Sequence, residues 1–141
     1  MKSLLLAMTF ALSASAMAAT PATTAVTALL ANGEYYGTNG TEKCSVKVVT
    51  ASDAVSVFIT TKKNSVGFTV VDSSSNYSVN EVTGEVSATQ KLTAPHYLQG
   101  AAKVLNMTTN DNDEVEVYIS TIATNHRGDD LSSYATCNVA K

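Results

Sequence analysis

The chain has 141 residues, of which 45% are apolar and 15% charged, and its formal net charge is −3. This length suits one domain, and the apolar fraction excludes a chain that is disordered throughout. The slightly acidic balance excludes a strongly basic nucleic-acid-binding protein, so nucleic acid is not an expected partner.

The first 18 residues have the layout of a secretory signal peptide. Lys2 gives a positive start, an apolar run covers residues 4–12, and Ala16-Met17-Ala18 fits the small-residue cleavage site. The apolar run is too short to anchor the chain in a bilayer. We therefore expect cleavage after Ala18 and a periplasmic or secreted protein that does not span a membrane. The mature chain would carry 8 basic and 12 acidic residues, a net charge of −4.

Residues 19–33 are expected to form a leader or a short helix. Thr20 is the expected cap, Pro21 falls at the first helical position, and Asn32-Gly33 would end the helix. Helical spacing gives the segment one apolar stripe, which consists of Ala22, Ala25, Val26, Leu29 and Leu30.

Residues 34–141 are expected to form a single all-β domain. Apolar and polar residues alternate in short stretches, and turn sequences separate these stretches about every ten residues, beginning with the hairpin signal Asn39-Gly40. The expected strands cover residues 34–38, 44–49, 55–59, 66–70, 77–82, 85–92, 97–107, 114–119 and 134–139. Eight or nine short strands in this arrangement predict a small antiparallel meander barrel, with a β-sandwich as the alternative.

Cys44 and Cys137 are the only two cysteines. An even number of cysteines in an exported chain predicts a disulfide. Their Cα atoms must then lie within about 7 Å of each other, so an early strand must lie beside the last strand. Closure of the sheet into a barrel would bring these strands together.

The sequence offers no constellation typical of catalysis or metal binding. His96 and His126 fall in expected loops, and no serine lies in a nucleophile-elbow pattern. No Cys/His pair has zinc-ligand spacing, and the acidic stretch 111–116 lacks the glycine of a calcium loop. We therefore expect a protein that is not an enzyme, with no catalytic residue, metal or cofactor.

Other motifs concern the surface. Tyrosine is enriched where proteins bind partners, which makes five tyrosines candidates for a binding surface: Tyr35, Tyr36, Tyr97, Tyr118 and Tyr134. In an expected exposed loop, Arg127-Gly128-Asp129 resembles the tripeptide of integrin ligands, although the same residues commonly form turns. Three glycosylation sequons, whose use depends on the host, begin at Asn39, Asn76 and Asn106.

Two stretches resemble known families in layout. Gly33-x-Tyr35 before a meander resembles the calyx families of the lipocalins and avidins, although those families carry a tryptophan there and this chain has none. The run from Tyr35 through Cys44-x-Val46-x-Val48 resembles small periplasmic protease-inhibitor barrels. Neither resemblance assigns a functional residue to this chain.

The sequence favours a small exported binding module. The first expectation is a non-catalytic module that binds another protein, as an inhibitor or an envelope accessory. The alternative is a carrier whose barrel cavity holds a small apolar ligand. A barrel interior lined by small residues and valine would favour the carrier. An interior filled by larger side chains would favour the protein-binding module, and the expected ones are Phe58, Phe68, Leu92 and Leu105.

Overall fold

Nine antiparallel strands and one short helix make up the computed structural model, which describes residues 20–74, 76–93 and 98–141. The strands are β1 (Gly33–Asn39), β2 (Glu42–Thr50), β3 (Ala54–Thr61), β4 (Ser65–Val71), β5 (Tyr77–Val79), β6 (Val86–Leu92), β7 (Leu98–Thr109), β8 (Glu114–Asn125) and β9 (Ser133–Ala140). They form one sheet in the order β4-β3-β2-β1-β9-β8-β7-β6-β5. The sheet curls into a nearly closed barrel, so the predicted all-β meander barrel is confirmed.

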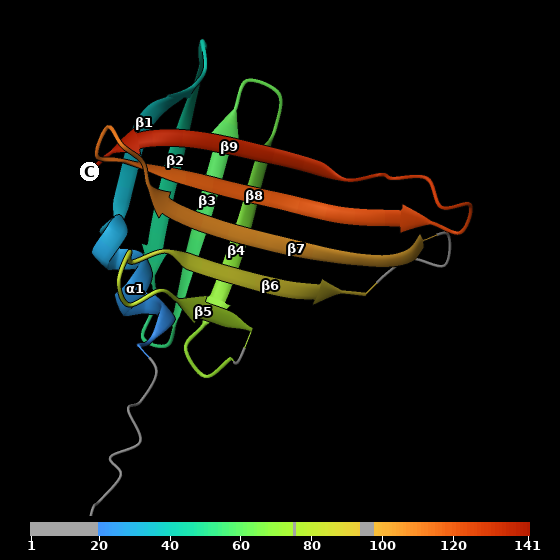
Figure 1. The fold of residues 1–141 in the computed structure, drawn as a ribbon, viewed down its shortest axis with the longest axis horizontal. Coiled ribbons are helices and arrows are strands. Elements are labelled where there is room, and N and C mark those ends of the chain that lie inside the picture. The colour runs from blue at the N-terminus through green and yellow to red at the C-terminus, as the bar shows by residue number, and fades with distance from the viewer. Residues whose placement is uncertain (1–19, 75, 94–97) are drawn as a thin grey trace, which may run out of the picture.

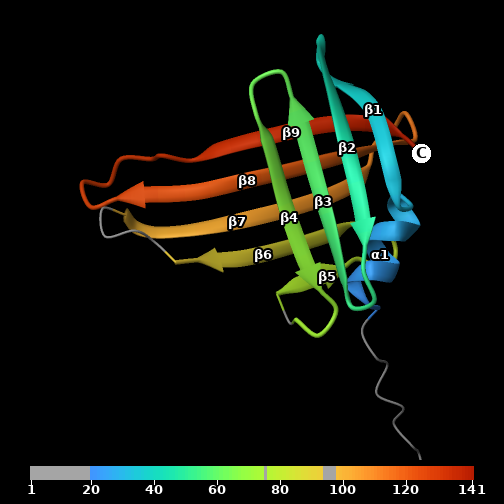
Figure 2. The same ribbon diagram turned by 180° about the vertical axis from the view of Figure 1, so that it is seen from behind.

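The two halves of the sheet pack across one another. Figures 1 and 2 show that β1–β4 run steeply across β6–β9, with the inner face of each half toward the other. Alternation along each strand sends every second side chain into the space between the halves. The largest side chains that are completely buried there are aliphatic and come from both halves: Ile59, Val46, Val48, Val57, Leu105, Met107 and Ile119.

A short ladder between β1 and β9 joins the two halves. β1 pairs with β2 over seven residue pairs but with β9 only at Gly37–Val139 and Thr38–Asn138. A side-chain carbon on Gly37 would overlap the carbonyl oxygen of Asn138, so the close approach of the two strands requires glycine. The sheet therefore folds over at this point.

The predicted disulfide is present at the same corner. Cys44 in β2 and Cys137 in β9 are bonded, with their Cα atoms 5.9 Å apart, and both belong to the buried core. The two strands lie close together in space, as expected, but they are not hydrogen-bonded partners because β1 lies between them in the sheet. The bond thus spans the inside of the fold and ties the two halves together.

Helix α1 (Ala22–Leu29) packs against one end of the barrel, where it contacts β3 to β7. The expected apolar stripe is the buried one, from Ala22 through Leu30. The expected start of the helix was wrong. Pro21 is the N-cap and no side chain caps the helix locally, because the Thr20 hydroxyl donates to Glu81 Oε1 at 3.0 Å instead.

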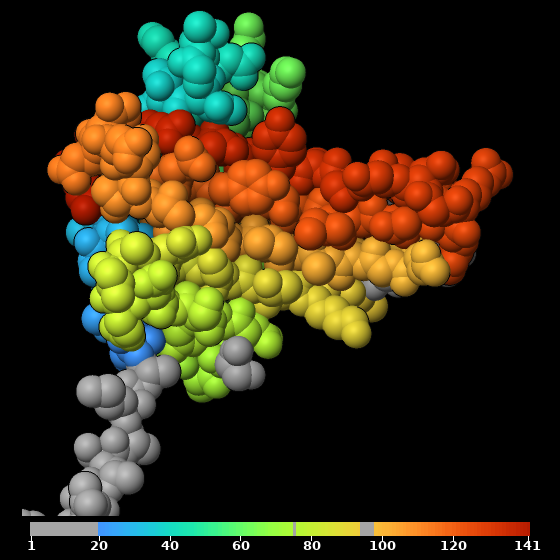
Figure 3. Space-filling model, in the orientation of Figure 1, coloured from blue at the N-terminus to red at the C-terminus, as the bar shows by residue number. Residues whose placement is uncertain are grey.

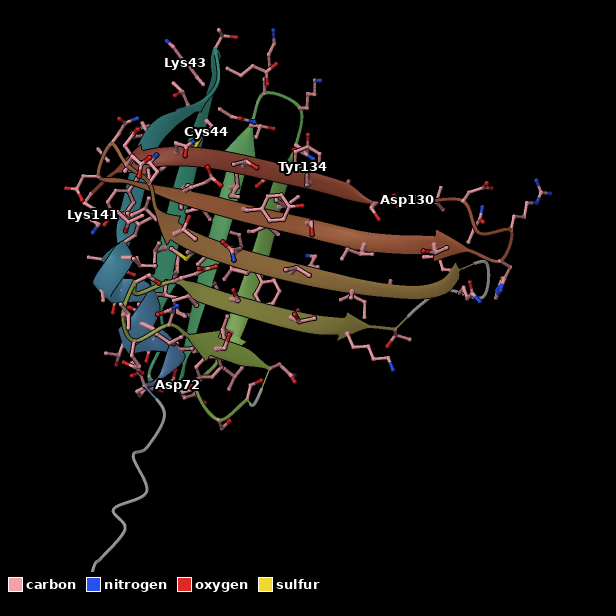
Figure 4. The ribbon with its side chains drawn as sticks, viewed as in Figure 1. Lys43, Cys44, Asp72, Asp130, Tyr134 and Lys141 are labelled. Carbon is pink, nitrogen blue, oxygen red and sulfur yellow. A yellow bond between two sulfur atoms is a disulfide. The ribbon has the colours of Figure 1, made fainter. Side chains whose placement is uncertain are left out.

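Asp72 supplies the missing cap from the connection between β4 and β5. Its carboxylate oxygens accept hydrogen bonds from the Thr23 N–H and the Thr23 hydroxyl, each at 2.8 Å. Asp72 lies beside the helix in Figure 4. The carboxylate serves a free N–H of the first turn and places negative charge at the positive end of the helix dipole.

Asp72→Ala should therefore lower the free energy of unfolding by about 1–2 kcal/mol, the usual effect of losing a cap. Urea denaturation followed by circular dichroism measures this loss. Asp53→Ala, which removes a carboxylate from the turn between β2 and β3, is the control. Equal unfolding midpoints for both variants and the unmodified protein would show that Asp72 does not anchor the helix.

The expected turns around residues 40, 52, 63 and 112 all connect strands, but two strand lengths differ from expectation. β5 has only three residues and is shorter than the expected 77–82, and β8 has 12 and is longer than the expected 114–119. β7, also with 12 residues, is close to the expected 97–107. The far ends of β7 and β8, with the β8–β9 connection, form a projection that we call the arm (residues 98–104 and 120–132). Figure 3 shows the arm extending well beyond the rest of the molecule.

Candidate functional site

Two of the predicted tyrosines meet on the outer face of the sheet. Tyr118 in β8 lies opposite Thr136, and Tyr134 in β9 lies opposite Ser120. Both tyrosines occupy positions on the face of the sheet that points away from the core. Their rings stack with centroids 5.9 Å apart and planes inclined by 27°. Tyr134, labelled on β9 in Figure 4, is 69% exposed, whereas the Ser120 side chain is buried.

Apolar side chains continue this surface onto the arm. In the ladder between β7 and β8, Val104 lies opposite Ser120 and Ala102 lies opposite Ile122. Ile122 is 48% exposed. We call the surface that these residues form with the tyrosine pair the tyrosine face; its members are Ala102, Val104, Tyr118, Ser120, Ile122 and Tyr134.

A shallow groove of about 550 Å³ borders the tyrosine face. It runs across β6, β7 and β8 and has Ile122 on its wall. Besides Ile122, the residues that line the groove are mostly small or uncharged. They are Thr89, Lys91, Gln99, Gly100, Ala101, Ala102 and Thr124. The groove therefore gives an approaching surface an apolar floor with one cation at its edge.

Polar side chains surround the tyrosine pair on the same face. Asn106, opposite Tyr118, donates through Nδ2 to Glu85 Oε1 at 2.9 Å and to Ser87 Oγ at 3.0 Å. Thr136 lies opposite Tyr118 on the other side. Tyrosine, serine, threonine and asparagine side chains together are typical of protein-recognition surfaces.

The other candidate tyrosines lie elsewhere. Tyr35 packs against the core, and its hydroxyl donates to the Ala31 carbonyl at 2.7 Å. Tyr36 is 77% exposed but lies on β1, in the other half of the sheet. Tyr97 lies outside the described residues. Sequence reasoning missed Val104 and Ile122. Both are apolar residues at outward-facing positions of a strand, and this pattern could have identified them.

Valine and alanine make up most of the buried core, which also contains larger side chains. Of the four larger side chains expected inside, Phe68 and Leu105 are buried, while the valine-rich lining is the one that the carrier alternative expected. Phe58 instead lies on the outside with its ring over Gly67, where a side-chain carbon would come within 2.5 Å of that ring. Leu92 is half-buried. A smaller depression of about 160 Å³ lies at the seam between the edge of β4 and β6.

Acidic and histidine side chains do not assemble into a further site in the part of the chain that the structure describes. No three of the His, Cys, Asp and Glu side chains in these ranges come close enough to hold a metal ion. His96 lies outside the described residues, and His126 is in the β8–β9 turn. The Ser132 hydroxyl and N–H hold the pKa of Asp130 below its usual value, so Asp130 is charged at neutral pH.

Among the described residues, no helix has the length and apolar character needed to cross a bilayer.

A comparison with known protein families, curated proteins and solved structures finds no significant match to this chain.

Proposed function

We propose that the protein is an exported, non-catalytic module that binds another protein through the tyrosine face. The observation that supports this proposal is the exposed Tyr134, which stacks on the half-buried Tyr118 near the exposed Ile122. These side chains lie outside the core, so packing of the fold does not account for them. Tyrosine offers a large contact area with few rotatable bonds, which makes it a frequent source of binding energy.

Two features support the export of this module. The disulfide between Cys44 and Cys137 is consistent with an oxidising compartment outside the cytoplasm. The first 18 residues carry the charge, apolar run and cleavage site of a signal peptide. A periplasmic or secreted inhibitor, or an accessory of the cell envelope, would meet its protein partners in such a compartment.

The shape of the site favours a protein partner over a small apolar ligand. Small ligands bind in concave pockets that enclose most of their surface. The tyrosine face is an open sheet surface, and its groove is shallow. The barrel interior, where the carrier alternative would place its ligand, is occupied by side chains such as Leu105, Met107 and Ile119.

Site-specific photo-cross-linking tests the proposal. A benzophenone amino acid replaces Tyr134 in one variant and Tyr36, which is equally accessible but lies on the other half, in a second. After incubation with envelope extract, we expect a discrete cross-linked protein at position 134 and none at position 36. The same products at both positions, or none at position 134, would contradict the proposed site.

Tyr134→Ala should then weaken binding of the cross-linked partner at least tenfold, which is the size expected for an aromatic side chain central to an interface. Biolayer interferometry with the purified partner measures this change. Tyr36→Ala is the matched control and should bind like the unmodified protein. Because Tyr134 is largely exposed, the Tyr134→Ala variant should have the same thermal unfolding midpoint as the unmodified protein.

A further inference from the structure

The tripeptide Arg127-Gly128-Asp129 lies at the extreme end of the arm. The turn between β8 and β9 carries it, and Figures 1 and 4 show this turn at the end of the molecule farthest from helix α1. All three residues are exposed. The six residues from Ser120 to Asn125 at the end of β8 span about 20 Å at the rise of a β-strand, so the turn stands well away from the barrel.

Asn125 holds the tripeptide in one defined conformation. Its side-chain Oδ1 accepts hydrogen bonds from the N–H groups of Arg127 and Asp129, each at 2.9 Å. Its backbone carbonyl accepts the Gly128 N–H at 3.0 Å. Gly128 has a φ of +85°, a left-handed conformation that glycine adopts without strain. A turn fixed in this way loses little conformational entropy when it binds a partner.

The turn presents one cation and one anion on the two sides of this glycine. The Arg127 guanidinium has no hydrogen-bond or ion-pair partner among the described residues, and only its backbone N–H is engaged. The Asp129 carboxylate accepts one hydrogen bond at Oδ2, from Asn125 Nδ2 at 2.9 Å. A carboxylate has about four lone-pair sites, so Oδ1 of Asp129 remains able to coordinate a metal ion.

We propose that this turn is the ligand of an integrin-type receptor, which recognises a guanidinium and a carboxylate together. Carboxylates of the receptor would pair with Arg127, and a divalent cation held by the receptor would take Asp129 as an oxygen ligand. The proposal is independent of the tyrosine face, which lies on the sheet surface and not at the end of the arm. It requires that the protein leaves the cell that makes it and meets the receptor.

Direct binding tests this proposal. The probes are soluble ectodomains of integrins that bind Arg-Gly-Asp peptides, immobilised in buffer with Mn²⁺ and exposed to the purified, disulfide-closed protein. We expect saturable binding that EDTA abolishes and that the linear peptide Gly-Arg-Gly-Asp-Ser-Pro displaces. Absence of binding to every ectodomain tested, or binding that persists in EDTA, would overturn the proposal.

Asp129→Glu provides the sharper variant, because it keeps the charge and moves the carboxylate by one methylene group. We expect its affinity to fall at least tenfold with no change in thermal unfolding. Asp111→Glu, in the turn between β7 and β8, makes the same chemical change at another exposed turn and should bind normally. Equal affinities for the two variants would show that Asp129 does not contact the receptor cation.

Tyr134→Ala separates this proposal from the proposed function. It should leave integrin binding unchanged while weakening the partner that binds the tyrosine face. A loss of both activities in Tyr134→Ala would mean that the two surfaces form one site, which contradicts their independence.

Discussion

The double variant Cys44→Ala/Cys137→Ala should unfold with a free energy about 4–5 kcal/mol lower than that of the unmodified protein. The two cysteines are 93 positions apart, and closing so long a loop removes much of the entropy of the unfolded chain. Both side chains are also buried where β2 and β9 approach, so their loss removes packing at the corner that joins the halves. This loss is a large fraction of the stability of a small domain.

Guanidinium-induced unfolding of the oxidised protein and of the double variant measures the difference. The unmodified protein in excess dithiothreitol is the control, because it lacks the bond but keeps both side chains. It should lie close to the double variant. A reduced protein that unfolds at the same denaturant concentration as the oxidised one would show that the disulfide contributes little to stability.

Gly37→Ala should have the next largest effect, a loss of about 3 kcal/mol or more. A methyl group at this position would overlap the Asn138 carbonyl oxygen and lie 2.8 Å from Val139 Cγ1. The first of these neighbours is backbone, which cannot rotate away as a side chain can. The two residue pairs that join β1 to β9 must separate to admit the methyl group.

Gly100→Ala is the matched control for this substitution. Gly100 is also a strand glycine, in β7, but nothing lies within 4 Å of the position that a methyl group would take there. Differential scanning calorimetry of the two variants should show a much lower midpoint for Gly37→Ala and little change for Gly100→Ala. Similar midpoints would mean that the junction between β1 and β9 adjusts without cost.

The fold could be predicted largely because each hairpin is local in sequence. The alternation of apolar and polar residues, as around Val46 and Val48, predicted the strands, and Asn39-Gly40 predicted the first turn. The length of β8 could not be predicted in this way. After Ile119 the regular alternation of apolar and polar residues that marks a strand disappears, because only Ser120 and Ala123 of the last six residues of β8 are buried.

The candidate site could be predicted only in part, for a different reason. Tyr35 and Tyr118 are alike as sequence features, but the phase of the strand directs Tyr35 toward the core and Tyr118 outward. The meeting of Tyr118 with Tyr134 depends on the register between β8 and β9. That register depends on which residues of the two strands are buried and on the geometry of the β8–β9 connection, which positions in sequence alone do not give.

The ladder between β1 and β9 has a consequence for the kinetics of folding. Within the described residues, every other strand pair joins neighbours in the sequence and can form as a local hairpin, whereas Thr38 and Asn138 are 100 positions apart. Bringing such distant segments together is the slow step for a chain of this topology. Once Cys44 and Cys137 are bonded, Gly37 and Val139 are held near each other even in the unfolded chain, because Gly37 lies seven positions before Cys44 and Val139 lies two positions after Cys137. Oxidation thus turns the one long-range search into a local one.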